Sequence, residues 1–183
     1  MTATGEALQG MLVCARVPHV DSRGSFDVLS NRDELAAAGV DLGLGQDNLI
    51  KTRRGVLRGM HYQSRRPQGK LATVLAGEVY DAAVDLRPDS PTYGRAMGRI
   101  LRAADHVSLW LPPGLAHGFL ALSEEVVYFY QVSAEWDPEE AHVLAWDDPE
   151  VGIDWPLASG EQPILSDRDR AGRSFASIRA ARP

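Results

Sequence analysis

The chain has 183 residues, of which 44% are hydrophobic, so it can bury the core of a folded domain rather than remain disordered. Its formal net charge of −6 excludes the broad basic surface that binds nucleic acid. No apolar run approaches the roughly 20 residues that cross a bilayer, and the polar start, Met1 to Gly10, lacks the apolar core of a signal peptide. We therefore expect one soluble domain over residues 1–183, with no nucleic-acid or membrane partner.

Cysteine usage indicates a reducing compartment. Cys14 is the only cysteine, so the chain contains neither a disulfide framework nor a paired-cysteine metal site. We expect a cytoplasmic protein. A few arginines in one cleft can still bind a phosphate ligand against the overall negative charge.

Short strands dominate the predicted secondary structure. Apolar and β-branched residues predict strands at 12–20, 56–63, 94–102, 106–113 and 126–133, and two strands within 70–87 joined near Gly77. A short helix is predicted at 31–40, with Asn31 as its cap and Gly39 as its stop, and the tail after Ser166 is helical. Strands at intervals of roughly ten residues indicate an antiparallel sandwich or barrel, because few helical segments are left to connect parallel strands.

The second strand of the 70–87 segment alternates in character. Asp81 and Asp85 share one face with Val79 and Ala83, and the opposite face is apolar. These carboxylates therefore need partners inside the protein or must line a cavity. A small antiparallel barrel encloses side chains or one small ligand, so we expect a site in the barrel mouth.

Common motifs for nucleotide and hydrolase chemistry are absent from the sequence. It contains no GxGxxG, GxxxxGK[ST], GxSxG or HExxH pattern. Polar residues embedded in strands remain as candidates, and they are Arg58, His61, Lys70, Asp81, His117, Tyr130 and Asp169. Strict alternation places Arg58 and His61 on opposite faces, but a bulge near Gly59 would bring both to one cavity.

The candidates fit proton transfer next to a carbonyl group. A histidine takes the proton, a lysine stabilises the enolate oxygen, and a tyrosine on the opposite face returns a proton with inversion. A carboxylate on the second imidazole nitrogen fixes the tautomer of the base. Asp169 is a candidate for that role, although the residues alone do not show that it reaches His61.

Seven segments follow one another in an order typical of a known family. They are DSRGSF (21–26), QDN (46–48), RRGVLRGMHYQ (53–63), QGKLATVLAGEVYDAAVDLRPDSPTYG (68–94), LPPGLAHGF (111–119), WDDPEVGIDWP (146–156) and PILSDRD (163–169). With these motifs the chain resembles the dTDP-4-dehydrorhamnose 3,5-epimerases of the cupin superfamily. The resemblance implies a mainly β fold, a cupin-type jelly-roll antiparallel β-barrel with a few short helices and a helical C-terminal tail. It also implies a homodimer, often with exchanged N-terminal strands.

The resemblance assigns a role to each catalytic candidate. His61 falls on the family's base and Asp169 on its aspartate partner. Lys70 falls on the residue that stabilises the enolate. Tyr130 falls on the acid of the opposite face, and motif register favours it over Tyr128. No cofactor and no metal are implied.

The resemblance also assigns the binding residues. Arg23 and Arg58 would bind the diphosphate, Gln46 and Asn48 would hold the nucleotide, and His117 would lie near the sugar. Two further residues complete this set, the buried Asp81 in support of the site and Trp136 as a platform for the base.

Several positions depart from the family pattern. Val28 replaces a glutamate and Ile50 lies where a serine is common. The aromatic TxYYxP stretch is replaced by SAEWDP, which contains Glu135, and the following ExG is replaced around Ala141 and His142. These substitutions fall around the ligand rather than on the proton-transfer residues.

The implied reaction is epimerisation of dTDP-4-keto-6-deoxy-D-glucose at carbon 3, carbon 5 or both. Three alternatives stay open from the sequence. The first is a 3-epimerase of antibiotic deoxysugar biosynthesis. The second is a metal-dependent cupin, although Gln63 breaks the HxH pair of such sites. The third is a non-catalytic sugar-nucleotide binding protein on the same fold.

Overall fold

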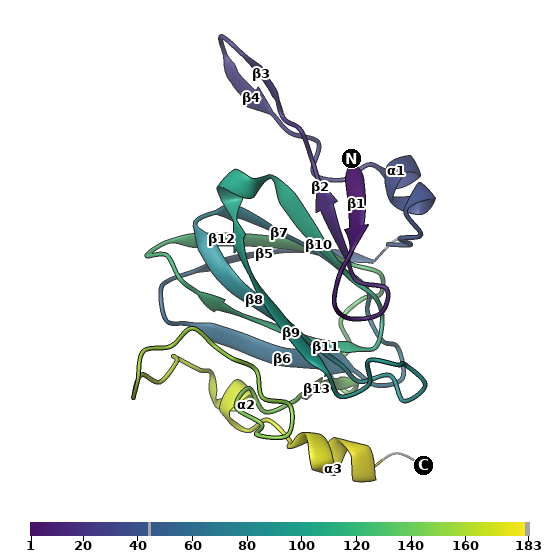
Figure 1. Cartoon of the computed structure of the whole chain (residues 1–183), viewed down its shortest axis with the longest axis vertical. Helices are drawn as coiled ribbons and strands as arrows, with labels where there is room; N and C mark the ends of the chain where they lie inside the picture. The colour runs from purple at the N-terminus through teal and green to yellow at the C-terminus, as the bar shows by residue number, and fades with distance from the viewer. Residues whose placement is uncertain (44, 182–183) are drawn as a thin grey trace.

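Two antiparallel sheets dominate the computed structural model, which describes residues 1–43 and 45–181 (Figure 1). In spatial order the six-stranded sheet contains β1 (Thr2–Gly5), β2 (Leu12–Ala15), β10 (Val107–Leu111), β7 (Lys70–Ala76), β12 (Val126–Val132) and β5 (Gln46–Thr52). The five-stranded sheet contains β13 (Ala141–Val143), β6 (Leu57–Gln63), β11 (Leu115–Ala121), β8 (Glu78–Asp85) and β9 (Ala96–Arg102). A separate hairpin pairs β3 (His19–Asp21) with β4 (Gly24–Phe26). The predicted mainly β, antiparallel jelly-roll fold is confirmed.

The helices are short and peripheral. They are α1 (Arg32–Ala37), the 3-10 helix η1 (Ala103–Asp105), α2 (Asp167–Arg170) and α3 (Phe175–Ala180). The Asn31 side chain accepts from the backbone N–H groups of Asp33 and Glu34, which confirms the predicted cap of α1. Helices α2 and α3 confirm the helical tail, whose last residues, Arg182 and Pro183, lie outside the described part of the chain. No helix in the described ranges has the length and hydropathy needed to cross a bilayer.

The main core lies between the two sheets. Leu109 and Tyr128 of the six-stranded sheet share one buried cluster with Val79 and Phe119 of the five-stranded sheet. The alternation predicted for β8 is confirmed, because Val79 and Ala83 face this core. The opposite face of β8 is also covered, since Ala82 and Val84 pack in a second cluster with α3 and the segment before it. Figure 1 shows these C-terminal helices below the five-stranded sheet.

One predicted strand is wrong. The segment 12–20 was expected as a single strand, but β2 ends at Ala15 and β3 begins at His19. Pro18 lies in the gap and has no N–H for a strand ladder, so the chain leaves the sheet there. Strands β1, β4, β5, β11 and β13 were not predicted. Every residue of β11 is buried, so its sequence lacks the alternation that marks a strand with one exposed face.

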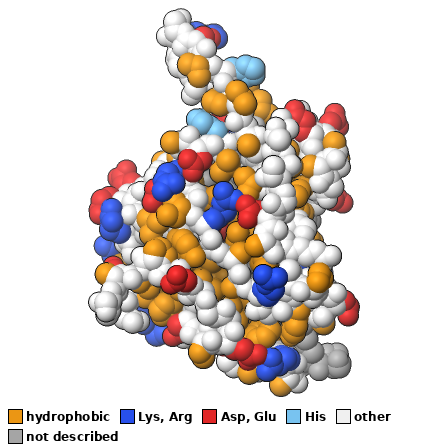
Figure 2. All heavy atoms as spheres, viewed as in Figure 1, with side chains coloured by type: hydrophobic (Ala, Val, Ile, Leu, Met, Phe, Trp, Pro, Cys, Tyr) orange, Lys and Arg blue, Asp and Glu red, His pale blue; other side chains and the backbone are white. Residues whose placement is uncertain are grey.

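The arm, residues 17–26, carries the β3–β4 hairpin away from the body of the protein (Figure 1). Val17, Val20 and Phe26 are exposed on it, and Figure 2 shows hydrophobic side chains along this projection. Its two ends are joined by Arg16 and Asp27, whose Nε and Oδ2 atoms lie 3.1 Å apart. The arm therefore has a fixed root but presents apolar side chains to solvent, an arrangement typical of an interaction surface.

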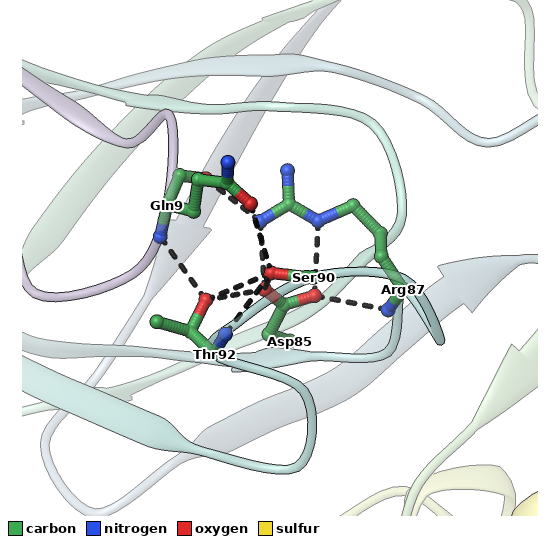
Figure 3. A network of polar contacts seen from close by, with 5 residues as sticks. All are labelled: Gln9, Asp85, Arg87, Ser90 and Thr92. Atoms are coloured by element: carbon green, nitrogen blue, oxygen red, sulfur yellow. Dashed lines mark hydrogen bonds and ion pairs between the residues drawn. The ribbon is translucent and has the colours of Figure 1, made fainter.

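A buried carboxylate ties the N-terminal loop to the turn after β8 (Figure 3). Asp85 accepts hydrogen bonds from Arg87 Nε at 2.9 Å and from the hydroxyls of Ser90 and Thr92, each at 2.6 Å. Arg87 Nη2 also donates to the carbonyl of Gln9 at 2.7 Å. Burial alone would raise the pKa of Asp85, but these hydrogen bonds lower it to about 2.

We expect Asp85→Asn to lower the free energy of unfolding at pH 7 by about 2 kcal/mol, since the ionised carboxylate is favoured in the folded state. The folded pKa is below the unfolded value, so this contribution is present above about pH 4 and is lost as the pH falls toward 2. Urea unfolding of both proteins between pH 2.5 and 7 measures it. A stability difference that does not shrink at low pH would contradict the assignment.

Candidate functional site

A cavity of about 340 Å³ lies in the barrel, between the two sheets. Its lining comes from β5, β6, β7, β11, β12, β13, α2 and two connecting segments. The lining residues are Gln46, Asn48, Ile50, Arg58, His61, Tyr62, Gln63, Gln68, Lys70, His117, Gly118, Phe119, Tyr128, Tyr130, Val132, Trp136, Ala141 and Arg168. Most of the predicted site residues are therefore in one place, as expected for a ligand pocket in a small barrel.

An irregular pairing of β6 with β11 brings Arg58 and His61 to the same cavity. His61 pairs with His117 and Arg58 pairs with Phe119, so the register shifts between these positions. The irregularity predicted near Gly59 is confirmed. Gly59 has a φ of +137°, and a Cβ there would lie 2.5 Å from the Cα of Gly118, so only glycine fits this close approach.

His61 is held by a carboxylate from the far end of the sequence. Its Nε2 lies 2.5 Å from Oδ1 of Asp169, a residue 108 positions away. Asp169 is buried in α2, whose cap Ser166 accepts the Asp169 N–H at 3.1 Å. Burial raises the pKa of Asp169, but the hydrogen bond and charge of His61, with further hydrogen bonds from Ser166 and Gly59, together hold the pKa below its usual value. The carboxylate thus stays ionised beside the imidazole at neutral pH.

The strand pairing explains how Asp169 reaches His61. Val56 forms a parallel bridge with Ile164, and Leu57 N–H donates to the Ile164 carbonyl at 3.0 Å. The segment before α2 therefore runs beside the start of β6. One helical turn then places Asp169 against the same strand.

Lys70 places a buried ammonium group beside His61. Its side chain is 7% exposed, and Nζ donates to the backbone carbonyl of His61 at 3.2 Å. Burial lowers the pKa of Lys70 to about 8, and the negative charge of Asp81 opposes this shift. At neutral pH Lys70 remains a cation that is poorly solvated and able to bind a developing negative charge.

A second carboxylate–imidazole pair is formed by His117, which lines the cavity, and Asp81 behind it. His117 Nε2 lies 3.0 Å from Oδ1 of Asp81, and both side chains are buried. The Tyr128 hydroxyl donates a hydrogen bond to Oδ2 of the same carboxylate. Burial, followed by the charge of Asp81, raises the pKa of Tyr128 well above its ordinary value. Tyr128 therefore serves as a neutral donor to Asp81.

Tyr130 follows Tyr128 by two residues on β12, so both side chains point to the same face of the strand and line the cavity. Burial raises the pKa of Tyr130, while the positive charge of Arg58 opposes the shift. The phenol is therefore protonated at neutral pH, the state that a proton donor needs.

The comparisons with known proteins agree with this geometry. The family model described as dTDP-4-dehydrorhamnose 3,5-epimerase matches residues 6–177. The chain belongs to this epimerase family. The enzyme of that name from Pseudomonas aeruginosa is 42% identical over 177 residues, covering 96% of this chain and 97% of the relative.

Solved structures of epimerases superpose closely on this chain. The Mycobacterium tuberculosis epimerase has a TM-score of 0.92 at 39% identity, covering 99% of this chain and 92% of that chain. The Legionella pneumophila enzyme, solved in complex with dTDP-4-keto-L-rhamnose, has a TM-score of 0.90 at 36% identity, covering 99% and 94%. The jelly-roll fold and the family resemblance are both confirmed.

One predicted binding residue of this epimerase-family chain does not line the cavity. Arg23 is on the turn of the arm, its side chain is 87% exposed, and it pairs with Asp21 at 2.6 Å. The other predicted binding residues, which are Gln46, Asn48, Arg58, His117 and Trp136, all line the cavity. Among them, Gln46 Nε2 donates to Asn48 Oδ1 at 2.6 Å.

The departures from the family motifs are divided between the cavity and its surroundings. Ile50 and Ala141 line it, whereas Val28, Glu135 and His142 are not among its lining residues. His142 instead lies 3.1 Å from the hydroxyl of Ser64. Only two of these five substituted positions therefore contribute to the lining of the cavity.

Arg168 is a cavity-lining cation that the sequence did not single out. It precedes Asp169 in a run of alternating charges, and such a run is ordinarily a solvated surface. The sequence feature that could have indicated Arg168 is its position directly before Asp169. Gln63 and Gln68 were also missed as cavity residues. Within residues 1–43 and 45–181, no group of three or more His, Cys, Asp or Glu side chains is placed to hold a metal ion.

We expect Asp81→Asn to lower the pKa of Lys70 below about 8, because the carboxylate favours the ammonium form. The chain has two lysines, so ¹³C-lysine labelling gives one signal for Lys70 and one for the exposed Lys51 as an internal reference. Asp89→Asn removes the same charge from an exposed loop and serves as the control. A Lys70 titration that is unchanged in Asp81→Asn would refute the coupling.

Proposed function

We propose that this chain is an isomerase that epimerises dTDP-4-keto-6-deoxy-D-glucose at carbons 3 and 5, without a cofactor. The observation that carries the proposal is the cavity in which His61, paired with Asp169, lies beside a buried ammonium and a protonated phenol. The family match and the names of the relatives support the substrate class. The chemistry follows from the roles that these side chains can take.

His61 is the base in this proposal. Its Nε2–H donates to the Asp169 carboxylate, so a neutral imidazole keeps its lone pair on the other ring nitrogen. That nitrogen removes the proton from the carbon next to the 4-keto group. The electron pair of the broken C–H bond moves into the carbonyl, which becomes an enolate.

Lys70 and Tyr130 complete the reaction. The poorly solvated ammonium of Lys70 stabilises the enolate oxygen more strongly than a solvated cation would. Tyr130 then donates its phenolic proton to the same carbon from the opposite face, which inverts the configuration. His61 and Tyr130 return to their starting states by proton exchange with water.

The remaining polar residues bind the nucleotide part. Arg58 and Arg168 supply two cations for the diphosphate, which carries negative charge. Asn48 and Gln46 offer amide groups to the base, and the exposed indole of Trp136 offers it a stacking surface. His117 lines the cavity near the sugar, and the buried Asp81 supports it through a hydrogen bond.

The alternatives are less well supported. A 3-epimerase is not favoured, because the family model and the curated relatives carry the 3,5-epimerase name. A metal centre lacks donors, since the imidazoles of His61 and His117 already pair with carboxylates and position 63 is glutamine. A binding protein without activity does not explain why the proton-transfer set is retained around one cavity.

We further propose a homodimer in which each arm reaches the partner subunit. The arm exposes Val17, Val20 and Phe26 to solvent, and its Arg23 is exposed and does not line the cavity of its own chain. Association would bury these apolar side chains and bring the guanidinium to the diphosphate of the neighbouring site. The cytoplasmic location stays a prediction from the single cysteine.

Incubation with the keto sugar in heavy water tests the reaction. We expect deuterium at carbons 3 and 5, and at least a ~100-fold slower exchange in His61→Ala, because the base is lost. Calorimetry should show that this variant still binds dTDP, and His142→Ala should retain exchange. Unchanged exchange in His61→Ala would show that another group is the base, and deuterium at carbon 3 alone would show a 3-epimerase.

Mixing two impaired variants, assayed at low substrate concentration, tests the exchanged arm. We expect Arg23→Ala to weaken binding about tenfold or more at low substrate concentration, because a charge-assisted hydrogen bond is lost. If the arm acts on the partner, a heterodimer of Arg23→Ala with His61→Ala contains one intact site. Unfolding and refolding the two variants together in equal amounts should then restore about a quarter of the wild-type activity. No recovery in a confirmed heterodimer would show that Arg23 does not act across the interface.

A further inference from the structure

Three cavity-lining glutamines all bond to the backbone of one short stretch of chain. This stretch, residues 134–137, is called here the Trp136 segment. Gln68 Nε2 donates to the carbonyl of residue 134 at 2.7 Å. Gln46 Oε1 accepts the N–H of residue 136 at 3.3 Å, and Gln63 Oε1 accepts the N–H of residue 137 at 2.9 Å. The segment is thus fastened to the cavity wall at three points by side-chain amides.

The Trp136 segment needs such fastening because it belongs to no strand. Strand β12 ends at Val132 and β13 begins at Ala141, so residues 134–137 lie in the connection between the two strands. The indole of Trp136 is 53% exposed and lines the cavity. Its position over the cavity therefore depends on how its backbone is held, rather than on packing of its own ring.

Gln63 is the most constrained of the three glutamines. It is 5% exposed, and its amide bonds at both ends, with Nε2 donating to the carbonyl of Arg66 at 2.9 Å. It follows His61 by two residues on β6, so it is carried by the strand that carries the proposed base. Gln46, by contrast, is exposed and also bonds to Asn48.

We propose that Gln63 is a positioning residue that sets the affinity for the nucleotide part of the substrate by holding the Trp136 segment at the cavity mouth. The inference rests on the proposed function, since it assumes that Trp136 contacts the nucleotide. Without the Gln63 amide, the N–H of Asp137 and the carbonyl of Arg66 lose their partners and the segment loses its buried anchor. The ligand must then order the segment on binding, which weakens affinity without changing the proton-transfer groups.

Gln63→Met keeps the length of the side chain and removes both hydrogen bonds. We expect KM for deuterium exchange and the dTDP dissociation constant to rise about tenfold, with kcat within about twofold of wild type. Gln63→Glu can still accept the N–H of Asp137 but cannot donate to Arg66, so its effect should be smaller. Gln162→Met changes an exposed glutamine outside the cavity and is the matched control.

The same substitution in a Trp136→Ala background shows whether the effect passes through the indole. We expect Gln63→Met to add little to the KM of Trp136→Ala, because the positioned ring is already absent. An undiminished effect in that background, or a fall in kcat at constant KM, would overturn the proposal. So would a Gln63→Met protein with wild-type KM. If Gln63→Met does not fold by circular dichroism, the Gln63→Glu pair in the two backgrounds gives the same comparison. A wild-type protein without exchange or dTDP binding would instead defeat the proposed function itself.

Discussion

The shifted pairing between β6 and β11 determines what the cavity contains. A regular strand would turn Arg58 and His61 to opposite faces, so the cavity would lose one of these two side chains. The shift requires two backbones to approach so closely at Gly59 and Gly118 that neither position tolerates a Cβ. Arg58 and His61 can therefore line one cavity only because Gly59 and Gly118, on adjacent strands, both lack a Cβ.

The ionisable groups of the site lie next to partners of opposite charge or hydrogen-bonding character. Each imidazole has its own carboxylate, His61 with Asp169 and His117 with Asp81, and Asp81 also favours the charged form of Lys70. Desolvation of any one of these groups alone would be unfavourable, and the partners reduce that cost. The arrangement leaves Lys70 with a pKa of about 8, while the carboxylate of Asp169 remains ionised. A reacting enolate would thus meet a cation whose charge is only partly neutralised by its surroundings.

Part of the fold and most of the site could be predicted from the sequence. Alternation identified β8, the cap at Asn31 located α1, and the motif register collected the residues that line the cavity. Local patterns could not find β11, because both of its faces are buried. Nor could they place Asp169 beside His61, since that contact depends on a bridge between segments more than a hundred residues apart. Without the family motifs, the charged run that contains Arg168 and Asp169 would be interpreted as a solvated surface segment.

The root of the arm has a consequence for assembly. Arg16 is nearly buried there, pairs with Asp27 and donates to the hydroxyl of Ser108 at 2.5 Å, and His106 Nδ1 lies 3.2 Å from the same carboxylate. These contacts join both ends of the hairpin to the start of β10, so its direction is set when the single chain folds. Association of two such chains would then bring together surfaces that are already oriented, and little backbone entropy would remain to be lost at the encounter.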